Sequence, residues 1–372
     1  MTLLNLKINK LKKYLNTVGI DVEFVIVRNR EALKYMVSEL YSPPPEEVPI
    51  QRIAVDMRTG VIEFYVSPLE YYRVKDVYGD EGVDVWAVAG SCIDLPSDIK
   101  CYERNILENV FKEKLLKYNR VAVDDPSLCE DIVCVDIRQA IRYIRRSKSI
   151  EEIEIIRKAV EITERSIELT ASSIKQGLSE IAIASVLERF ARELGAEGFA
   201  FSTIVAVGEN TAKPHHISSH KIFSGTEPIL IDFGVRVSGY VSDITRILIP
   251  SNVDKSYVEL IKIVDSARLN AISAIKSGTS CNDIDLVARS TLKVHNIHQF
   301  FIHGLGHGVG VDVHEEPRLG QTSKDHLIEG DVVTVEPGVY IHGKYGVRIE
   351  DLVVVHKDGA HILSKGPKVL EI

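Results

Sequence analysis

Apolar residues recur at steps of three and four in the second part of the chain, which is the spacing of an amphipathic helix. The clearest case follows Ser149, which stands three residues before Glu152 and so forms a capping-box signature for a helix start. A second apolar face of this kind spans residues 179–194 and ends at Gly195. The first helix is expected to bury the face formed by Ile153, Ile156, Val160, Thr163 and Ile167.

The same order of elements occurs twice after residue 145. Two predicted helices precede a group of β-branched and aromatic runs, and helices predicted at 256–276 and 282–295 precede a second group. The predicted strands are 202–207, 229–233, 235–237 and 240–249 in the first half, and 311–313, 332–336, 339–341 and 347–355 in the second. This order predicts an α+β domain of two pseudo-symmetric halves, with antiparallel sheets that face a shared centre.

Residues 1–142 show a different pattern and are expected to form a smaller mixed α/β domain, a scaffold or dimer arm before a domain at 143–372. Strands are predicted at 22–27, 52–55 and 61–66, and a helix at 105–117. The first fifteen residues place lysines within an apolar pattern, which is typical of an amphipathic helix and not of a signal peptide. Four prolines predict a loop at 41–49, and the basic residues of 142–148 predict a solvated linker.

Composition and charge exclude some classes of partner. A length of 372 residues exceeds the size at which a single core usually stops growing, so two domains are expected. The formal net charge of -8 argues against a nucleic-acid-binding protein, which would carry a basic face. No apolar run approaches the length of a membrane span. We therefore expect neither a nucleic-acid nor a membrane partner.

The cysteines are odd in number and contain no C-x-x-C pair. They are Cys92, Cys101, Cys129, Cys134 and Cys281. This usage suits a reducing compartment and argues against both a disulfide framework and a thiolate zinc site. With the N-terminal pattern, it predicts a cytoplasmic protein.

Each half carries two acids at matching places in its predicted strands. Asp232 and Glu336 each follow an apolar strand core directly, and Asp243 and Glu350 lie further along the same hairpin-like segments. A carboxylate buried at such a place is costly unless its charge is compensated. Two matching pairs are hard to explain as surface residues, so we expect the four carboxylates to meet.

A glycine-dense run at 299–317 carries three histidines, His303, His307 and His314. So many glycines predict a loop and strand edge where the backbone approaches something closely. Adding His307 to the four acids gives oxygen ligands with one nitrogen, a set that suits Mn²⁺, Co²⁺, Fe²⁺ or Zn²⁺. Four negative charges also balance two divalent cations, which is the arithmetic of a dinuclear centre with a shared hydroxide nucleophile.

A rival hypothesis pairs the acids with arginines in salt bridges. The candidates are Arg236, Arg246 and Arg348. This alternative stays open for Glu350, which lies two residues from Arg348. It is disfavoured for the five metal-ligand candidates taken together.

Several blocks resemble the signatures of the pita-bread-fold metallopeptidases, and most of all those of the prolidases and proline aminopeptidases. The blocks are I-D-F-G and G-Y-V-S-D-I-T-R, then H-G-L-G-H-G-V-G-V-D-V-H-E, then E-P-G-V-Y and V-R-I-E-D. The resemblance covers residues 145–372. It extends more loosely to the N-terminal domain, where V-D-M-R-T-G and F-Y-V-S-P-L-E-Y-Y resemble a creatinase-type domain.

The resemblance implies a metal-binding role for the five residues. The implied ligands are Asp232, Asp243, His307, Glu336 and Glu350. Asp243 and Glu350 would bridge the two metals, Asp232 would chelate one of them, and His307 and Glu336 would bind the other. Glu336 would also move the catalytic proton.

Four further residues are implied in catalysis and substrate contact. His215 would contact the substrate and the tetrahedral intermediate, and His303 and His314 would lie beside the scissile bond and the proline pocket. Arg348 would contact a substrate carboxylate or support the bridging acid. For Tyr340, aromatic packing on a strand is favoured over the alternative of lining the pocket. His216, which follows His215, is given no role.

These residues together imply a peptidase that hydrolyses the Xaa-Pro imide bond of dipeptides through a hydroxide bridging two divalent metals. Mn²⁺ or Co²⁺ is expected, with Fe²⁺ or Zn²⁺ as alternatives, and a small peptide with proline second is the expected substrate. An aminopeptidase acting on longer Xaa-Pro peptides is the alternative. Methionine aminopeptidases usually lack the leading domain, while creatine-type hydrolases and non-enzymatic relatives lack the ligands. The N-terminal domain suggests a homodimer.

Overall fold

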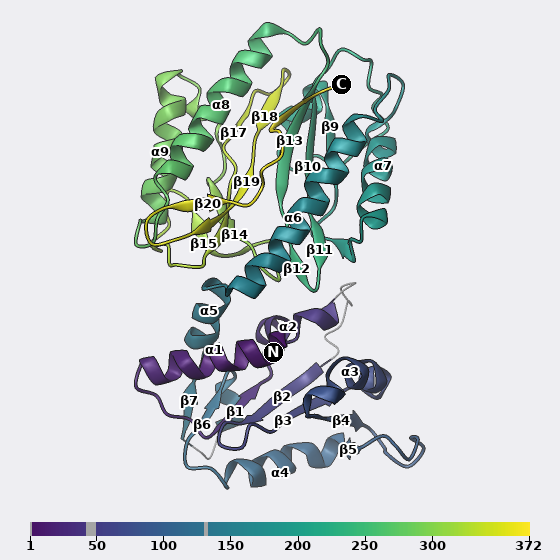
Figure 1. Ribbon diagram of the computed structural model, residues 1–372, viewed down its shortest axis with the longest axis vertical. Helices are drawn as coiled ribbons and strands as arrows, with labels where there is room; N and C mark the ends of the chain where they lie inside the picture. The colour runs from purple at the N-terminus through teal and green to yellow at the C-terminus, as the bar shows by residue number, and fades with distance from the viewer. Residues whose placement is uncertain (1, 42–49, 130–132) are drawn as a thin grey trace. The chain divides into compact units, whose positions relative to one another are not determined.

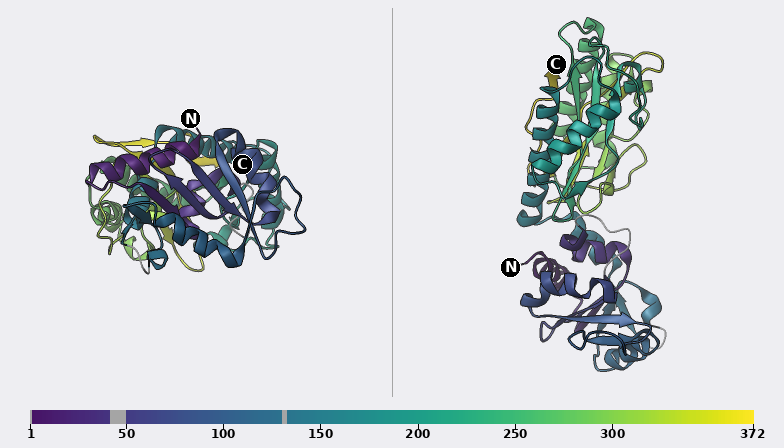
Figure 2. Two further views of the ribbon diagram at one scale, coloured as in Figure 1. Left: turned by 90° about the horizontal axis from the view of Figure 1, so that it is seen from below. Right: turned by 90° about the vertical axis from the view of Figure 1, so that its right-hand side faces the viewer.

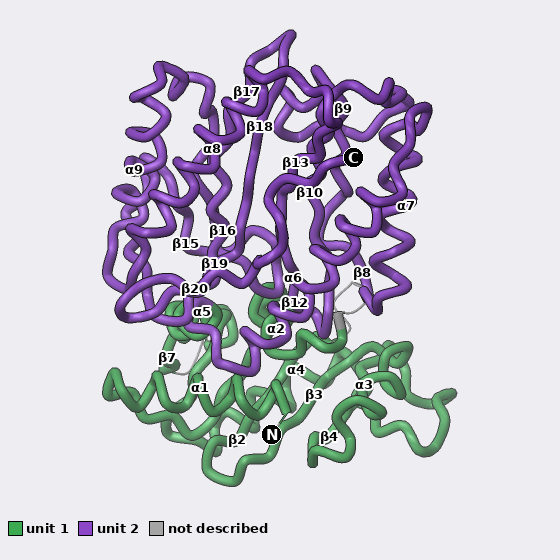
Figure 3. Tube along the Cα trace, turned by 45° about the horizontal axis from the view of Figure 1, so that its top comes forward, with its two compact units in different colours: residues 1–145 green, residues 146–372 purple. Residues whose placement is uncertain are grey.

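A computed structural model of the chain describes residues 2–41, 50–129 and 133–372. The chain divides into two compact units, Met1–Arg145 and Arg146–Ile372, coloured separately in Figure 3. The expected boundary after residue 142 lies three residues before this division. Residues 42–49, which contain most of the predicted proline-rich loop, lie outside the described residues. No helix of the described residues is long and apolar enough to cross a membrane.

The first unit is built on a seven-stranded sheet with the order β5-β4-β3-β2-β1-β6-β7. Strands β1, β2 and β3 are antiparallel neighbours, and the outer pairings are parallel. Its strands are β1 Phe24–Val27, β2 Ile50–Asp56, β3 Ile62–Val66, β4 Val83–Ala89, β5 Cys101–Glu103, β6 Val121–Val123 and β7 Cys134–Asp136. Its helices are α1 Leu3–Thr17, α2 Arg30–Met36, α3 Tyr71–Tyr78, α4 Arg104–Leu115 and α5 Arg138–Arg146. The predicted N-terminal helix and mixed α/β character are confirmed.

Both faces of this sheet are covered, because all four residues of β1 are buried. Phe24 and Ile26 on one face join a cluster with Leu107, Phe111 and Leu115 of α4. Figure 1 shows α1 and α4 on opposite sides of the strands. The sheet therefore lies in the middle of the unit as its core.

The first unit contains two disulfides, so the prediction of no disulfide framework is wrong. Cys92 bonds to Cys101, and Cys129 bonds to Cys134. The second cysteine of each pair opens a strand, β5 or β7, and its partner precedes it by only nine or five residues. A count of cysteines and a search for C-x-x-C do not detect such local closures. The cysteine argument for a reducing compartment is therefore lost, and Cys281 remains as a buried free thiol.

The second unit repeats one order of elements in two halves, as the periodicity predicted. The first half contains α6 Ile150–Ala171, α7 Glu180–Glu193, β8 Gly198–Phe199, β9 Ile204–Val207, β10 Ile229–Phe233, β11 Val235–Val237, β12 Tyr240–Val241 and β13 Ile244–Ile249. The second contains α8 Lys255–Ser273, α9 Cys281–Val294, β14 Gly306–Gly308, β15 Glu315–Leu319, β16 Val332–Val335, β17 Gly338–Tyr340, β18 Gly346–Arg348, β19 Asp351–Val355, β20 Ala360–Ile362 and β21 Val369–Glu371. The predicted capping box of Ser149 and Glu152 begins α6.

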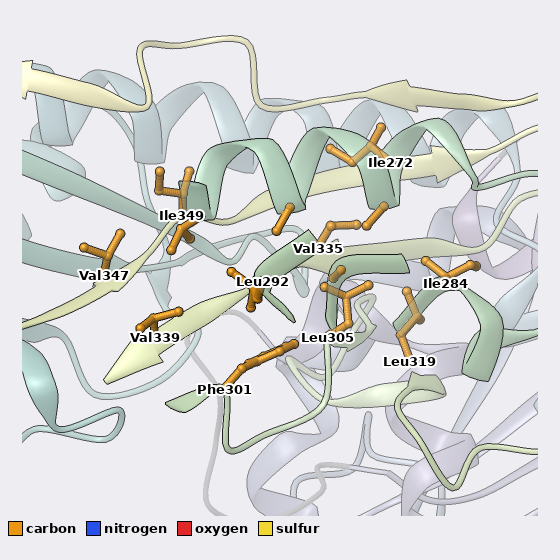
Figure 4. Close-up of a cluster of buried hydrophobic side chains, with 14 of the residues drawn as sticks. Ile272, Ile284, Leu292, Phe301, Leu305, Leu319, Val335, Val339, Val347 and Ile349 are labelled. Carbon is orange, nitrogen blue, oxygen red and sulfur yellow. The ribbon is translucent and has the colours of Figure 1, made fainter. Parts of the chain in front are cut away.

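Two antiparallel sheets form the centre of this unit. One has the order β21-β13-β10-β9, with only β21 parallel to its neighbour, and the other has the order β15-β14-β16-β19-β20. Figures 1 and 2 show the strands between the helix pairs α6–α7 and α8–α9. Apolar side chains such as Leu292 of α9, Leu305 and Val335 point into one layer in Figure 4. This core holds the strand ends that carry the acids.

Two local predictions for this unit are wrong. Residues 311–313 form a bend and not a strand, because the Glu315 carboxylate accepts the backbone N–H groups of Val311 and Asp312. The basic segment 142–148 is largely helical and not a solvated linker, since α5 extends to Arg146. Lys148 is only 6% exposed and forms an ion pair with Glu315.

Candidate metal centre

The four acids lie at equivalent places in the two halves. Asp232 is the fourth residue of β10 and Glu336 directly follows β16, while Asp243 and Glu350 directly precede β13 and β19. Strands β10 and β13 pair antiparallel, as do β16 and β19, so each hairpin returns its second acid beside its first. The predicted meeting of the acids is therefore built into the strand pairing of both halves.

Strand β14 inserts His307 among these acids, and its glycines make this approach possible. A Cβ on Gly306 would lie 2.1 Å from the Thr334 carbonyl oxygen, and one on Gly308 would lie 2.2 Å from that of Glu316. The predicted close backbone approach is therefore present. His307 Nδ1 lies 3.1 Å from the Gly308 carbonyl oxygen, which leaves Nε2 to face the carboxylates.

His307 Nε2 lies 3.3 Å from Glu336 Oε1 and 3.6 Å from Asp243 Oδ2. One ligand atom each from Asp243, His307 and Glu350 all lie within 4.8 Å of one another. Asp243 is 5% exposed and Glu350 is 1% exposed. The structure thus gathers a nitrogen and several carboxylate oxygens in a buried space of the size that cations occupy.

The electrostatics of this cluster favour a cation. Burial and the neighbouring carboxylates raise the pKa of Asp243 and of Glu350 well above their ordinary values. Asp232 Oδ1 and Glu350 Oε1 are buried without a hydrogen-bond partner. Unpartnered buried carboxylate oxygens are costly, and divalent cations with oxygen-rich ligand sets remove that cost. The residues present therefore fit a divalent metal site.

The rival salt-bridge hypothesis accounts for one oxygen of the cluster. Arg348 lies 2.6 Å from Asp232 Oδ2. Arg246 forms its ion pairs with Glu164 and Asp351, outside the cluster. It donates to the backbone carbonyl of Glu350 and not to its carboxylate. Arg236 donates to the carbonyls of Gly239 and Val311. The arginines leave the other acids of the cluster uncompensated.

Histidines surround the cluster at short range. The ring centroids of His307 and His314 are 4.4 Å apart, and burial, followed by the neighbouring His307, lowers the pKa of His314. The carbonyl oxygen of Pro214, next to His215, lies 3.4 Å from an Arg348 nitrogen. The structure therefore brings His215 and His314 to the margin of the same cluster. His303 reaches it through Tyr340, as described below.

A family model described as metallopeptidase family M24 matches residues 154–357, more than half of the chain. The chain belongs to this family. Among its relatives, the Xaa-Pro dipeptidase of Pyrococcus furiosus is 38% identical over 63% of this chain and 67% of its own length. The uncharacterized peptidase YqhT of Bacillus subtilis is 29% identical over 99% of this chain and all of its own.

Solved structures agree with this M24 membership. The X-Pro aminopeptidase from Thermotoga maritima superposes with a TM-score of 0.79 at 28% identity, covering 98% of this chain and 99% of its own. The prolidase from Pyrococcus furiosus superposes with a TM-score of 0.71 at 29% identity, covering 95% and 99%. The predicted pita-bread fold with a leading domain is confirmed. The chain is a metallopeptidase that resembles the prolidases, and its family implies divalent metal ions.

Tyr340 does more than pack on its neighbours. Its hydroxyl lies 2.9 Å from His303 Nε2 and 2.8 Å from an Arg348 nitrogen, and these hydrogen bonds were not predicted. His303 Nδ1 lies 2.8 Å from the Gly304 carbonyl, which favours a proton on Nδ1 and leaves Nε2 to accept from Tyr340. Tyr340 therefore links His303 to Arg348, and Arg348 in turn to Asp232. Its place at the end of E-P-G-V-Y, four residues after Glu336, was the available signal.

Proposed function

We propose that this chain is a dinuclear metallopeptidase that hydrolyses the Xaa-Pro bond of dipeptides. The observation that carries the proposal is the buried meeting of four carboxylates and one imidazole, with oxygens of Asp232 and Glu350 left unpartnered. The Xaa-Pro dipeptidase named among the relatives supports the substrate class. The proposed ligands are Asp232, Asp243, His307, Glu336 and Glu350.

When bound, divalent ions at this site would polarise the scissile carbonyl and lower the pKa of a water molecule. Asp243 and Glu350 would be shared by the two ions, because each contacts a residue of the other half: Glu350 accepts from the Thr245 hydroxyl, and Asp243 lies 3.6 Å from His307 Nε2. Mn²⁺ or Co²⁺ is proposed, with Fe²⁺ or Zn²⁺ as alternatives that the ligand set also accepts.

The chain's own residues are proposed to handle protons and orientation. Glu336 lies beside His307 Nε2, whose hydrogen bond offsets the effect of burial and lowers the pKa of that carboxyl. From this place beside the site, the ionised carboxylate is proposed to accept a proton and return it to the leaving nitrogen. His215 and His314 are proposed to contact the substrate, and the Arg348–Tyr340–His303 chain to hold His303 beside the scissile bond.

Metal-stimulated release of proline from Met-Pro tests this function. Purified protein is stripped with a chelator, and turnover is measured with and without added Mn²⁺ or Co²⁺. Cleavage that appears with metal and disappears on chelation is expected, with Met-Ala as the matched substrate that lacks the proline ring. Absence of metal-stimulated cleavage of Xaa-Pro substrates would falsify the proposal.

An aminopeptidase acting on longer Xaa-Pro peptides is the second candidate, favoured by the likeness to the X-Pro aminopeptidase structure over nearly the whole chain. The two activities differ in whether the pocket accepts residues after proline. Comparing kcat/KM for Met-Pro with that for Met-Pro-Ala separates them. A higher value for the tripeptide would replace the dipeptidase proposal with the aminopeptidase.

Two further proposals concern assembly and location. A homodimer is proposed because leading domains of this type often mediate pairing, and light scattering that gives a monomer mass contradicts it. Cytoplasmic residence stays a prediction that rests on the N-terminal pattern, and cell fractionation tests it.

A further inference from the structure

Two buried carboxylates outside the metal centre hold the loops that carry histidines proposed to act on substrate. They are Glu180, the first residue of α7, and Asp285, the fifth residue of α9. Both are fully buried. Each lies on the second helix of its half, but at a different position along that helix. The two halves therefore both anchor a histidine-bearing loop to a buried carboxylate, from different helix positions.

Glu180 gathers hydrogen bonds from both ends of the His215 loop, residues 208–221. Its Oε1 accepts from the Val207 N–H and from Asn210 Nδ2, each at 2.8 Å. Its Oε2 accepts from the Ser219 N–H at 2.9 Å and the Ser219 hydroxyl at 2.6 Å, and lies 2.7 Å from His216 Nε2. One carboxylate therefore closes the base of this loop.

The charge of Glu180 is sustained by these donors. Burial raises the pKa of this carboxyl, and the hydrogen bonds from His216, Ser219 and Asn210 more than offset it, so the pKa is lowered. The loop also returns to the start of α7, where the Glu180 N–H donates to the Lys221 carbonyl. A carboxylate with this many donors fixes their positions closely, because each donor loses a charge-assisted bond if it moves.

The far end of the same loop meets the metal centre. The Pro214 carbonyl lies 3.4 Å from an Arg348 nitrogen, and the Gly346 N–H donates to the Thr211 hydroxyl at 2.8 Å. His215 lies between Pro214 and the Glu180 contact His216. Its backbone is therefore held from the centre on one side and from Glu180 on the other.

Asp285 acts in the second half together with Arg289. Its Oδ1 accepts from the Leu305 N–H at 3.0 Å, and its Oδ2 accepts from Arg289 Nε at 2.7 Å. Arg289 then donates to the carbonyls of Phe301 and His303, at 2.8 and 2.5 Å. This pair thus spans the whole His303 loop, residues 301–305.

We propose that Glu180 and the Asp285–Arg289 pair are positioning residues, each of which sets the backbone of one loop and through it His215 or His303. The proposal rests on the peptidase function proposed above. A misplacement of about 1 Å at a reacting centre costs about 10²-fold in rate.

Loop-resolved hydrogen exchange tests the positioning itself and needs no catalytic activity. In metal-loaded protein, Glu180→Gln places an amide N–H₂ against donors and is expected to accelerate exchange in residues 208–221 but not in 301–305. Asp285→Asn is expected to do the reverse, so each variant is the matched control of the other. Ser219→Ala and Arg289→Lys are milder variants of the same two sites and are expected to give smaller effects in the same loops.

Double-mutant kinetics then separate positioning from general stability. Glu180→Gln is expected to lower kcat/KM by about 10–100-fold, the range for residues that orient catalytic groups. In a His215→Ala background, the effect of Glu180→Gln on kcat/KM should fall to about twofold or less, because the residue that it positions is gone. In a His303→Ala background the effect should persist, because the free-energy effects of independent sites are additive. Asp285→Asn should show the opposite dependence.

Unchanged exchange in the anchored loop, equal acceleration in both loops, or equal kinetic losses in both histidine backgrounds would overturn the proposal. Loss of the peptidase function is recognised separately. If the unmodified protein cleaves no Xaa-Pro substrate, the function fails, and the exchange measurements alone decide whether the carboxylates position the loops.

Discussion

The two units of this chain bury charge very differently. In the described part of residues 1–145, the buried charged residues are Lys7, Arg52 and Asp124. In residues 146–372 they are Lys148, Glu152, Glu180, Arg236, Asp243, Arg246, Arg268, Asp285, Asp331, Arg348, Glu350 and Asp351. Removing a charge from water costs several kcal/mol unless it is well paired. The second unit therefore carries an electrostatic cost that the first largely avoids.

Most of this charge in the second unit is compensated within it. Asp351 pairs with Arg246, Arg268 and Lys368, and Asp331 pairs with Arg146. The metal centre is the exception, because its acids outnumber the arginine beside them. The uncompensated charge marks this cluster as the candidate functional site, because strongly perturbed ionisable groups tend to gather at such sites.

The first unit differs from the second in what stabilises it. Its sheet has an aromatic and aliphatic core, and both disulfides lie at its edges. Cys101 opens the edge strand β5 and Cys134 opens the edge strand β7. We infer that this unit depends on covalent links for stability, whereas the second depends on bound cations.

The most severe test of this contrast is Asp243→Ala. It is expected to abolish metal binding and to lower turnover by roughly 10³-fold or more. This loss exceeds the effect of removing one hydrogen-bond donor that stabilises a transition state. Metal content by elemental analysis and Met-Pro kinetics measure the two effects. Asp358→Ala, an exposed acid of the same unit, is the control and should retain both. An active Asp243→Ala variant would remove this residue from the centre.

Tyr340→Phe is expected to have a smaller effect within the same unit. Losing the hydroxyl breaks the link between His303 and Arg348, so kcat should fall by about 10²-fold, the scale of general acid–base groups. Metal content should not change. Tyr345→Phe is the control, since the Tyr345 ring packs on Tyr257 outside this chain of hydrogen bonds. A rise in KM at constant kcat would indicate uniform substrate binding instead.

The site acids could be predicted from sequence because their positions follow from local patterns. Asp232 and Glu336 end apolar strand cores, and this signal is visible without knowing which strands pair. The hydrogen bonds of Tyr340 were missed because they depend on two partners, His303 and Arg348, that only the folded strands bring together. Glu180 was missed for the same reason, since the start of a helix gives no sign of the loop it holds.

Predictions that assumed exposure failed where a distant partner decides burial. Lys148 belongs to a run of basic residues, which is usually solvated, yet Glu315 pairs with it from 167 residues away. The strand predicted at 311–313 failed because the same Glu315 carboxylate imposes a bend. Periodicity therefore predicted the elements, and long-range side-chain contacts determined the departures from it.

Chelator and reductant should act on different units. Removing metal is expected to destabilise residues 146–372 by about 3–4 kcal/mol at metal concentrations of 100–1,000 times Kd. Reducing the two short disulfide loops is expected to cost residues 1–145 about 2–3 kcal/mol each by chain entropy. Hydrogen exchange measured over peptides of each unit separates the responses. A common response of both units to either reagent would break the contrast.

The smallest expected difference lies in how the first helix of each unit begins. The capping box of α6 is reciprocal, with the Glu152 N–H donating to Ser149 and the Ser149 N–H donating to Glu152 at 2.8 Å. The cap of α1 is not reciprocal, because the Thr2 hydroxyl only accepts, from the Asn5 N–H at 3.4 Å and from Asn5 Nδ2 at 3.1 Å. Ser149→Ala should therefore lower the free energy of unfolding of its unit by about 1 kcal/mol, and Thr2→Ala by less than about half of that. Urea unfolding followed by exchange in each unit measures both, and equal losses would show that these two caps do not differ in strength.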